Sequence, residues 1–151
     1  FKRDVAVPPD LPARVEKLLL DRAREALALA NKAGAVVTGF AKVEAAIAAR
    51  PLALLHAAEA GEDGIEKLDR RYRAVVGDEA LVLRIFTGAE MDLALGRSNV
   101  VHAALDRGPA ARACLNRIRS LLRYRSVELS AFGDDRRDGE AGRPASGTDR
   151  E

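Results

Sequence analysis

The stretch LALANKAGAVVTGFAKVEAAI, residues 27–47, narrows most strongly what this chain can fold into. Gly34 follows a helix-forming run at a point where glycine readily adopts the left-handed conformation that ends helices. Two β-branched valines lie between this glycine and Gly39, and they predict a very short buried strand. Thr38 then stands where its side chain could cap a second helix, which must end before Pro51. The stretch therefore predicts a helix–strand–helix unit.

The alternation of helices and strands continues along the chain. The run at 52–58 is continuously apolar, as in a strand that is buried on both faces. The other expected elements are a first helix from 10 to about 32, a helix at 65–76, a strand at 81–86, a helix from a Thr87–Glu90 capping box to Gly96, a strand at 99–105, and a last helix from Pro109 to about 125. This order predicts an α/β fold, a three-layer α/β/α sandwich around a small four-stranded sheet that is largely parallel or mixed.

Composition limits the class of protein. A length of 151 residues with 48% apolar residues suits one folded domain. A single cysteine excludes an internal disulfide and fits the cytoplasm, and no apolar run approaches the roughly 20 residues that span a bilayer, so we expect no membrane partner. From Gly133 onward the chain has no apolar cluster, and we assign residues 126–151 to a disordered tail.

The sequence offers little that could support catalysis. His56 and His102 fall inside expected strands, and Cys114 lies on the apolar side of a helix, so we interpret all three as structural. Neither a zinc-ligand spacing nor a phosphate-binding glycine loop is present in the sequence. The acidic residues of 59–63 follow a strand end, where α/β proteins often place sites, although a solvated acidic loop explains them better. We expect no enzymatic activity, metal or cofactor.

The last helix carries a basic face. At 100° per residue, one narrow face holds Arg112, Asn116, Arg119 and Arg123. No acidic residue lies between 109 and 125, so this face could follow phosphates, and Tyr124 could stack on a base. A solvated face that favours the helix dipole explains the same pattern equally well. The net charge of +2 is too small to decide between them.

Three segments, KAGAVVTGFAKVEAAI, LALLHAAEA and ALGRSNVVHAAL, resemble the kink-turn RNA-binding ribosomal proteins of the L-seven-Ae type. The resemblance covers about residues 21–125. The opening segment FKRDVAVPPDLPARVEKLL is similar to the end of a YlxR-type nucleic-acid-binding domain, so residues 1–20 are expected to close such a domain and start the first helix. The resemblance implies an α/β/α fold and RNA binding near transcription, including its termination, or ribosome function.

The resemblance also implies a site made of three loops at one end of the sheet. In the family's first loop, a glycine is followed by Asn two residues on, Glu three on and Lys six on. Gly39 matches the glycine, whereas Ala41, Lys42 and Ala45 replace the other three. Because alanine offers no donor or acceptor to a base edge, the resemblance implies weakened kink-turn specificity, while Lys42 can still hold phosphate.

The second loop survives as Ala58–Glu59, and the third corresponds to residues 97–101. Together with the basic face, the expected RNA-binding residues are Lys32, Thr38, Gly39, Lys42, Glu59, Arg97, Ser98, Asn99, Arg112, Arg119 and Arg123. The expected partners are structured or ribosomal-type RNA and the transcription or translation machinery. The alternative is a protein-interaction module that has lost RNA recognition on the same fold.

Overall fold

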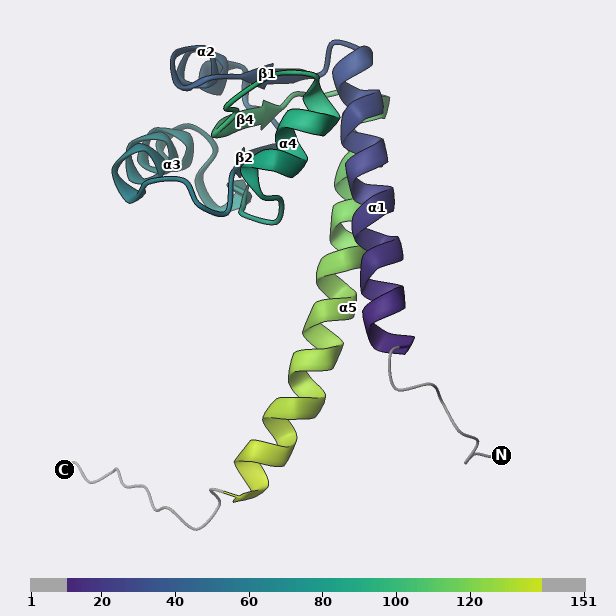
Figure 1. The fold of residues 1–151 in the computed structure, drawn as a ribbon. Coiled ribbons are helices and arrows are strands. Elements are labelled where there is room, and N and C mark those ends of the chain that lie inside the picture. The colour runs from purple at the N-terminus through teal and green to yellow at the C-terminus, as the bar shows by residue number, and fades with distance from the viewer. Residues whose placement is uncertain (1–10, 140–151) are drawn as a thin grey trace, which may run out of the picture.

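The computed structural model describes residues 11–139, in which helices and short strands alternate (Figure 1). The elements are α1 Leu11–Lys32, β1 Val36–Thr38, α2 Phe40–Ala46, η1 Ile47–Ala49, β2 Ala53–His56, α3 Glu62–Val76, η2 Gly77–Glu79, β3 Val82–Leu83, α4 Gly88–Leu95, β4 His102–Leu105 and α5 Pro109–Gly139. No helix within the described range is long and apolar enough to cross a membrane.

The four strands form one mixed sheet in the order β1-β4-β2-β3. Strands β2 and β3 are parallel, whereas β4 runs antiparallel to both of its neighbours. Helices α2 and α3 cover one face of the sheet, and α1, α4 and α5 cover the other. The predicted α/β fold with a four-stranded sheet is therefore confirmed, and the sheet is mixed.

Each face of the sheet has its own apolar core. On the α1–α4–α5 side the core includes Leu27, Leu55 and Ile118, all at most 1% exposed. On the α2–α3 side the core is smaller and includes Leu68 and Tyr72. Every residue of β2 and β4 is buried, which agrees with the continuous apolar run that predicted a central strand.

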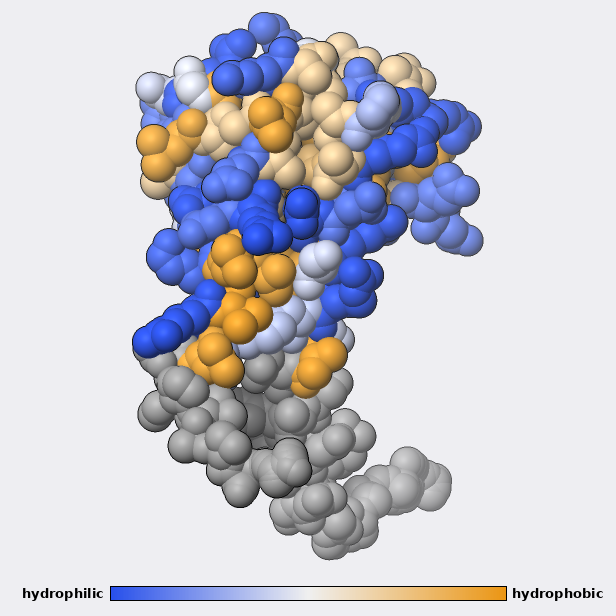
Figure 2. Space-filling view, turned by 90° about the vertical axis from the view of Figure 1, so that its right-hand side faces the viewer, coloured by the Kyte–Doolittle hydropathy of each residue, from blue (hydrophilic) through white to orange (hydrophobic). Residues whose placement is uncertain are grey.

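Helices α1 and α5 form an antiparallel pair that extends beyond the sheet (Figure 1). The Tyr124 hydroxyl donates to the Pro12 carbonyl at 3.0 Å, and Arg125 Nε donates to the Glu16 carboxylate at 2.8 Å. Apolar side chains lie along this pair among hydrophilic ones (Figure 2), and Leu18 is half exposed. The long first helix is thus packed along the last one.

Two expectations about helix ends need correction. Helix α5 continues to Gly139, so residues 126–139, which composition assigned to the tail, are helical. The reason is that an established helix gains one hydrogen bond per added residue, and Gly133 costs only about 1 kcal/mol. Thr38 does not cap α2: it ends β1 opposite Ala103, and the N-cap is Gly39 without a side-chain hydrogen bond. The expected start at residue 10 and the tail expected at residues 140–151 lie outside the described residues.

The predicted capping box at the start of α4 is present. Glu90 N–H donates to Thr87 Oγ1 at 3.1 Å, and Thr87 N–H donates to Glu90 Oε1 at 2.9 Å. Replacing Thr87 with alanine is expected to lower the free energy of unfolding by about 1 kcal/mol, because an amide of the first turn loses its acceptor. Urea denaturation measures this difference, and a serine at position 87 should restore most of it.

Candidate functional site

The three loops expected from sequence meet at one edge of the sheet. Because β4 is antiparallel to β1 and β2, its start lies beside the ends of both strands. We call this place, together with the adjoining first turn of α2, the loop edge, made of residues 38–42, 58–61 and 96–101. One hollow there, of about 470 Å³, is lined by Thr38, Gly39, Gly96, Arg97, Ser98, Asn99 and Val100. A second, of about 390 Å³, includes Glu59 and shares Asn99 and Val100 with the first.

Gly39 turns the chain from β1 into α2 at this edge. Its φ of 97° lies in a region that residues with a Cβ rarely adopt, so the turn requires glycine. Its N–H donates to the His102 carbonyl at 3.0 Å, which ties the turn to the start of β4. Lys42 lies in the first turn of α2, and its side chain is exposed.

The loop at 96–101 is held by a single carboxylate. Asp92 Oδ2 accepts from the Asn99 N–H at 3.0 Å, and Asp92 Oδ1 accepts from the Val100 N–H at 2.8 Å. Asn99 has a φ of 60°, a left-handed conformation that asparagine tolerates better than most residues. These contacts fix the backbone and leave Asn99 exposed where the two hollows meet. Sequence reasoning missed the part played by Asp92.

Acidic side chains near the loop edge are largely committed to other contacts. Both carboxylate oxygens of Glu59 lie 3.1 Å from the Gly88 amide nitrogen, at the start of α4. Glu90 completes the capping box of the same helix. By contrast, Lys42 and Arg97 are exposed and have no ion pair within the described part of the chain. The loop edge therefore presents two cations that remain available to an anion.

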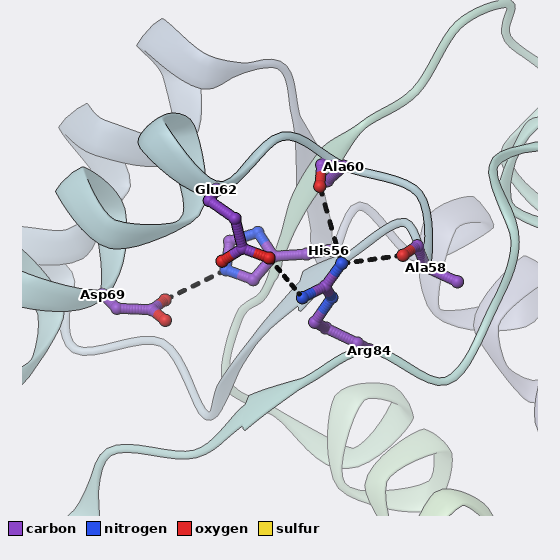
Figure 3. A network of polar contacts seen from close by, with 6 residues as sticks. All are labelled: His56, Ala58, Ala60, Glu62, Asp69 and Arg84. Carbon is purple, nitrogen blue, oxygen red and sulfur yellow. Dashed lines mark hydrogen bonds and ion pairs between the residues drawn. The ribbon is translucent and has the colours of Figure 1, made fainter.

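Arg84 lies beside the second loop and contacts its backbone, as Figure 3 shows. Its guanidinium donates to the Ala58 carbonyl at 2.7 Å, to the Ala60 carbonyl at 3.5 Å and to Glu62 at 3.3 Å. Arg84 falls inside the strand that the sequence predicts at 81–86. The strand is in fact only Val82–Leu83, and the arginine serves the neighbouring loop.

A chain of three polar side chains lies beneath the Gly39 turn. His56 and His102 face each other across β2 and β4, with 2.8 Å between their Nδ1 atoms, and His56 Nε2 is 3.0 Å from Asp69 Oδ1. The Asp69 carboxylate accepts from His56 Nε2–H, so the Nδ1 of a neutral His56 carries no proton and can only accept. When both rings are neutral, the hydrogen bond between them therefore runs from His102 Nδ1–H to His56 Nδ1. His102 also contacts the Phe40 ring edge-on. Through these side-chain contacts, α3, β2, β4 and α2 are connected to one another.

Sequence reasoning took both histidines as structural but did not find their partner. Each lies in a strand, yet their pairing depends on the antiparallel register of β2 and β4, which nothing local in the sequence specifies. Asp69 belongs to the face of α3 that packs on the sheet, since it lies four residues after the buried Ile65 and three before the buried Tyr72. Cys114 is fully buried, and burial raises the pKa of its thiol to about 12.

The histidine chain predicts a pH dependence of stability. Burial, together with the nearby His56, lowers the pKa of His102 in the folded state, although Asp69 opposes this. Below about pH 6.5 the unfolded chain therefore binds a proton that the folded chain does not, and stability falls by at most about 1.4 kcal/mol per pH unit. As the pH decreases further, this loss of stability stops once the pH is below the pKa of His102 in the folded state. Urea denaturation at pH 7.5 and 5.5 measures it.

The control for this prediction is His102→Gln, which cannot take up the proton. Its stability should change less than that of the natural protein between the two pH values. An equal change in both proteins would show that other groups cause the dependence.

The arginine face of α5 does not join the loop edge. Helix α5 starts after the end of β4, at the opposite edge of the sheet, and Arg112, Arg119 and Arg123 are exposed along it. Arg119 lines a different hollow there. Lys32 ends α1 and precedes β1, whereas Gly39 follows that strand. The structure thus unites Thr38, Gly39, Glu59, Arg97, Ser98 and Asn99 at one edge, with Lys42 on the adjoining helix turn.

The described residues hold no cluster of three or more His, Cys, Asp or Glu side chains arranged for a metal ion.

Comparison with known proteins gives no matching family model and no similar curated protein. Among solved structures, a protein with unknown function from Bacillus halodurans matches with a TM-score of 0.57 and 18% identity, over 64% of this chain and 96% of that one. At this identity the likeness shows a shared fold.

Proposed function

We propose that this chain is a non-enzymatic RNA-binding domain whose binding surface is the loop edge, with weakened specificity for kink-turns. The observation that carries the proposal is the convergence of the loops at 38–39, 58–61 and 96–101 around two adjoining hollows. Two exposed cations that lack ion pairs in the described structure, Lys42 and Arg97, stand at this edge. The resemblance to kink-turn binders supports a role near transcription, its termination, or ribosome function, and the single cysteine suits a cytoplasmic domain.

In the proposed mechanism, positive charges bind the RNA phosphates, and the shape of the loop edge lets the RNA backbone approach. Lys42 and Arg97 hold phosphates, and Gly39 lets the RNA backbone come close because it has no side chain. Asn99 offers an amide that can both donate to and accept from a base edge. The base-reading Asn and Glu of the family's first loop are replaced here by Ala41 and Lys42, so phosphate contacts would dominate the affinity.

A protein-interaction module is the second candidate, and one observation favours it. Phe40 and Val101 lie at the loop edge, and these residues are 36% and 39% exposed. An apolar contact with a protein would bury them. Binding through phosphates should weaken by about 0.7 to 0.9 log-log units per contact as salt rises, whereas apolar docking should change far less.

Chemical-shift mapping by NMR tests where RNA binds. Adding a structured RNA should shift the amide signals of Gly39, Gly96 and Asn99 at the loop edge, while glycines remote from it, such as Gly77, should move little. Shifts confined to the face of α5 that carries Arg112 and Arg123 would contradict the proposed site. Shifts at Phe40 and Val101 with a protein partner, and none with RNA, would favour the second candidate.

A further inference from the structure

A third hollow lies at the edge of the sheet opposite the loop edge. It has a volume of about 480 Å³, within the range of about 300 to 1,000 Å³ that small-molecule sites occupy. Because β2 and β3 are parallel and β4 opposes β2, the segments before β2, before β3 and after β4 meet here. Its apolar lining is Pro51, Leu52, Val76, Ala80, Leu81 and Leu115, with Tyr72 among them.

Three arginines from separate elements converge on this hollow: Arg50 before β2, Arg107 after β4 and Arg119 from α5. Within the described residues none of the three forms an ion pair, although Asp78 and Glu79 line the same hollow. Three guanidinium groups that are not neutralised by an ion pair make a surface that favours an anion, and arginine suits the bidentate binding of phosphate.

The backbone positions two of these arginines. Arg50 has a φ of 59°, a left-handed conformation that costs a non-glycine residue about 1 to 2 kcal/mol. In this conformation its carbonyl accepts a hydrogen bond from Arg107 Nε at 2.9 Å. The bond leaves both terminal nitrogens of the Arg107 guanidinium free to bind. Tyr72 is buried nearby and donates its hydroxyl to the Pro51 carbonyl at 2.7 Å, so the wall behind the arginines is fixed.

The carboxylates restrict what the hollow could hold. Asp78 and Glu79 are exposed and come from η2, on the β3 side of the hollow. They would repel a uniformly anionic ligand but would accept hydrogen bonds from hydroxyl or amino groups. A fitting ligand therefore has a phosphate at one end, sugar hydroxyls or amines at the other, and an apolar surface between them.

We propose that this hollow binds a nucleoside phosphate, with the phosphate on Arg50, Arg107 and Arg119 and the hydroxyl or amino donors toward Asp78 and Glu79. The nucleotide could be free or the 5′-phosphorylated end of an RNA, because both present the same groups. The proposal is independent of the loop edge and stands whether or not RNA binds there.

Isothermal titration with adenosine 5′-diphosphate, adenosine and inorganic phosphate tests this site in the whole chain. Adenosine 5′-diphosphate should bind, and adenosine should bind at least tenfold more weakly. Arg119→Met and Arg107→Met should each reduce the affinity for the diphosphate about tenfold or more, since each removes a charge-assisted contact. Arg123→Met is the matched control: this arginine is exposed on the same helix, does not line the hollow, and its loss should leave binding unchanged.

Competition distinguishes the two sources of the phosphate. If an RNA end is the ligand, a short 5′-phosphorylated RNA should displace the diphosphate, and the same RNA with a 5′-hydroxyl should not. If neither displaces it, the ligand is the free nucleotide. Equal binding of adenosine and its diphosphate, an equal loss in Arg123→Met, or no binding at millimolar concentration would overturn the proposal. Circular dichroism of Arg107→Met and Arg119→Met checks that both variants are folded.

Discussion

Replacing Leu27 with alanine is expected to lower the free energy of unfolding by about 2 to 5 kcal/mol. Leu27 lies in α1 with no exposed surface, inside the larger core that joins α1 and α5 to the sheet. The substitution removes buried methyl groups and leaves a cavity, because the helices on either side can close it only in part. Urea denaturation followed by circular dichroism measures the loss.

The matched control is Leu29→Ala in the same helix. Leu29 is 63% exposed, so its truncation should change stability by less than about 0.5 kcal/mol, although the chemical change is identical. Similar losses in both variants would mean that α1 does not pack as the structure has it. The comparison therefore tests how the long first helix is turned about its axis, with Leu27 inward and Leu29 outward.

Reversing the charges of Lys42 and Arg97 together, as Lys42→Glu with Arg97→Glu, is expected to weaken RNA binding by at least about tenfold at moderate salt. Both side chains are exposed, and neither has an ion pair in the described structure, so their loss should leave the fold intact. The slope of log affinity against log salt should also flatten by about 1.4 to 1.8, which corresponds to two lost phosphate contacts. Fluorescence anisotropy at several salt concentrations measures both quantities.

Arg112→Glu with Arg123→Glu makes the same change in net charge on the exposed face of α5. If RNA binds at the loop edge, this control should lose far less affinity and keep most of the salt slope. Equal losses in the two double variants would show that total charge, rather than the loop edge, sets the binding. A greater loss in the control would move the site to the arginine face.

The features that could be predicted from the sequence are those with local causes. The T-x-x-E pattern at Thr87 specified a capping box, and Gly96 ended the same helix in the left-handed conformation. Pro51 limited the end of the preceding helical segment, and the apolar run at 52–58 gave the central strand β2. Each signal acts over a few residues, so the order of the elements follows from them.

The features that sequence reasoning missed are those that no local sequence pattern specifies. The antiparallel register of β2 and β4 places His56 against His102, and only then does Asp69 complete the chain beneath Gly39. Asp92 pins the Asn99 loop from a helix that precedes it. The length of α5 was underestimated. The loss of apolar residues shows where the helix stops packing on the core, but its backbone hydrogen bonds continue beyond that point.

The candidate site was predicted in part for the same reason. The loops containing Gly39, Glu59 and Arg97 were expected together from the resemblance, and the structure brings them to one edge. The arginine face was identified from helical periodicity, which fixes a direction around α5 but not the helix's place in the fold. Arg119 consequently proved to line a hollow at the other edge.

The measurement that tests the central claim most directly is an anisotropy titration of this chain against three labelled RNAs at two salt concentrations. The RNAs are a kink-turn, a plain duplex of equal length and a single strand. The proposed function, in which Ala41 and Lys42 stand where the kink-turn binders that this chain resembles have base-reading residues, predicts salt-sensitive binding to all three with little preference for the kink-turn. Tight binding confined to the kink-turn would contradict the predicted loss of specificity. No binding at low salt would contradict RNA binding itself.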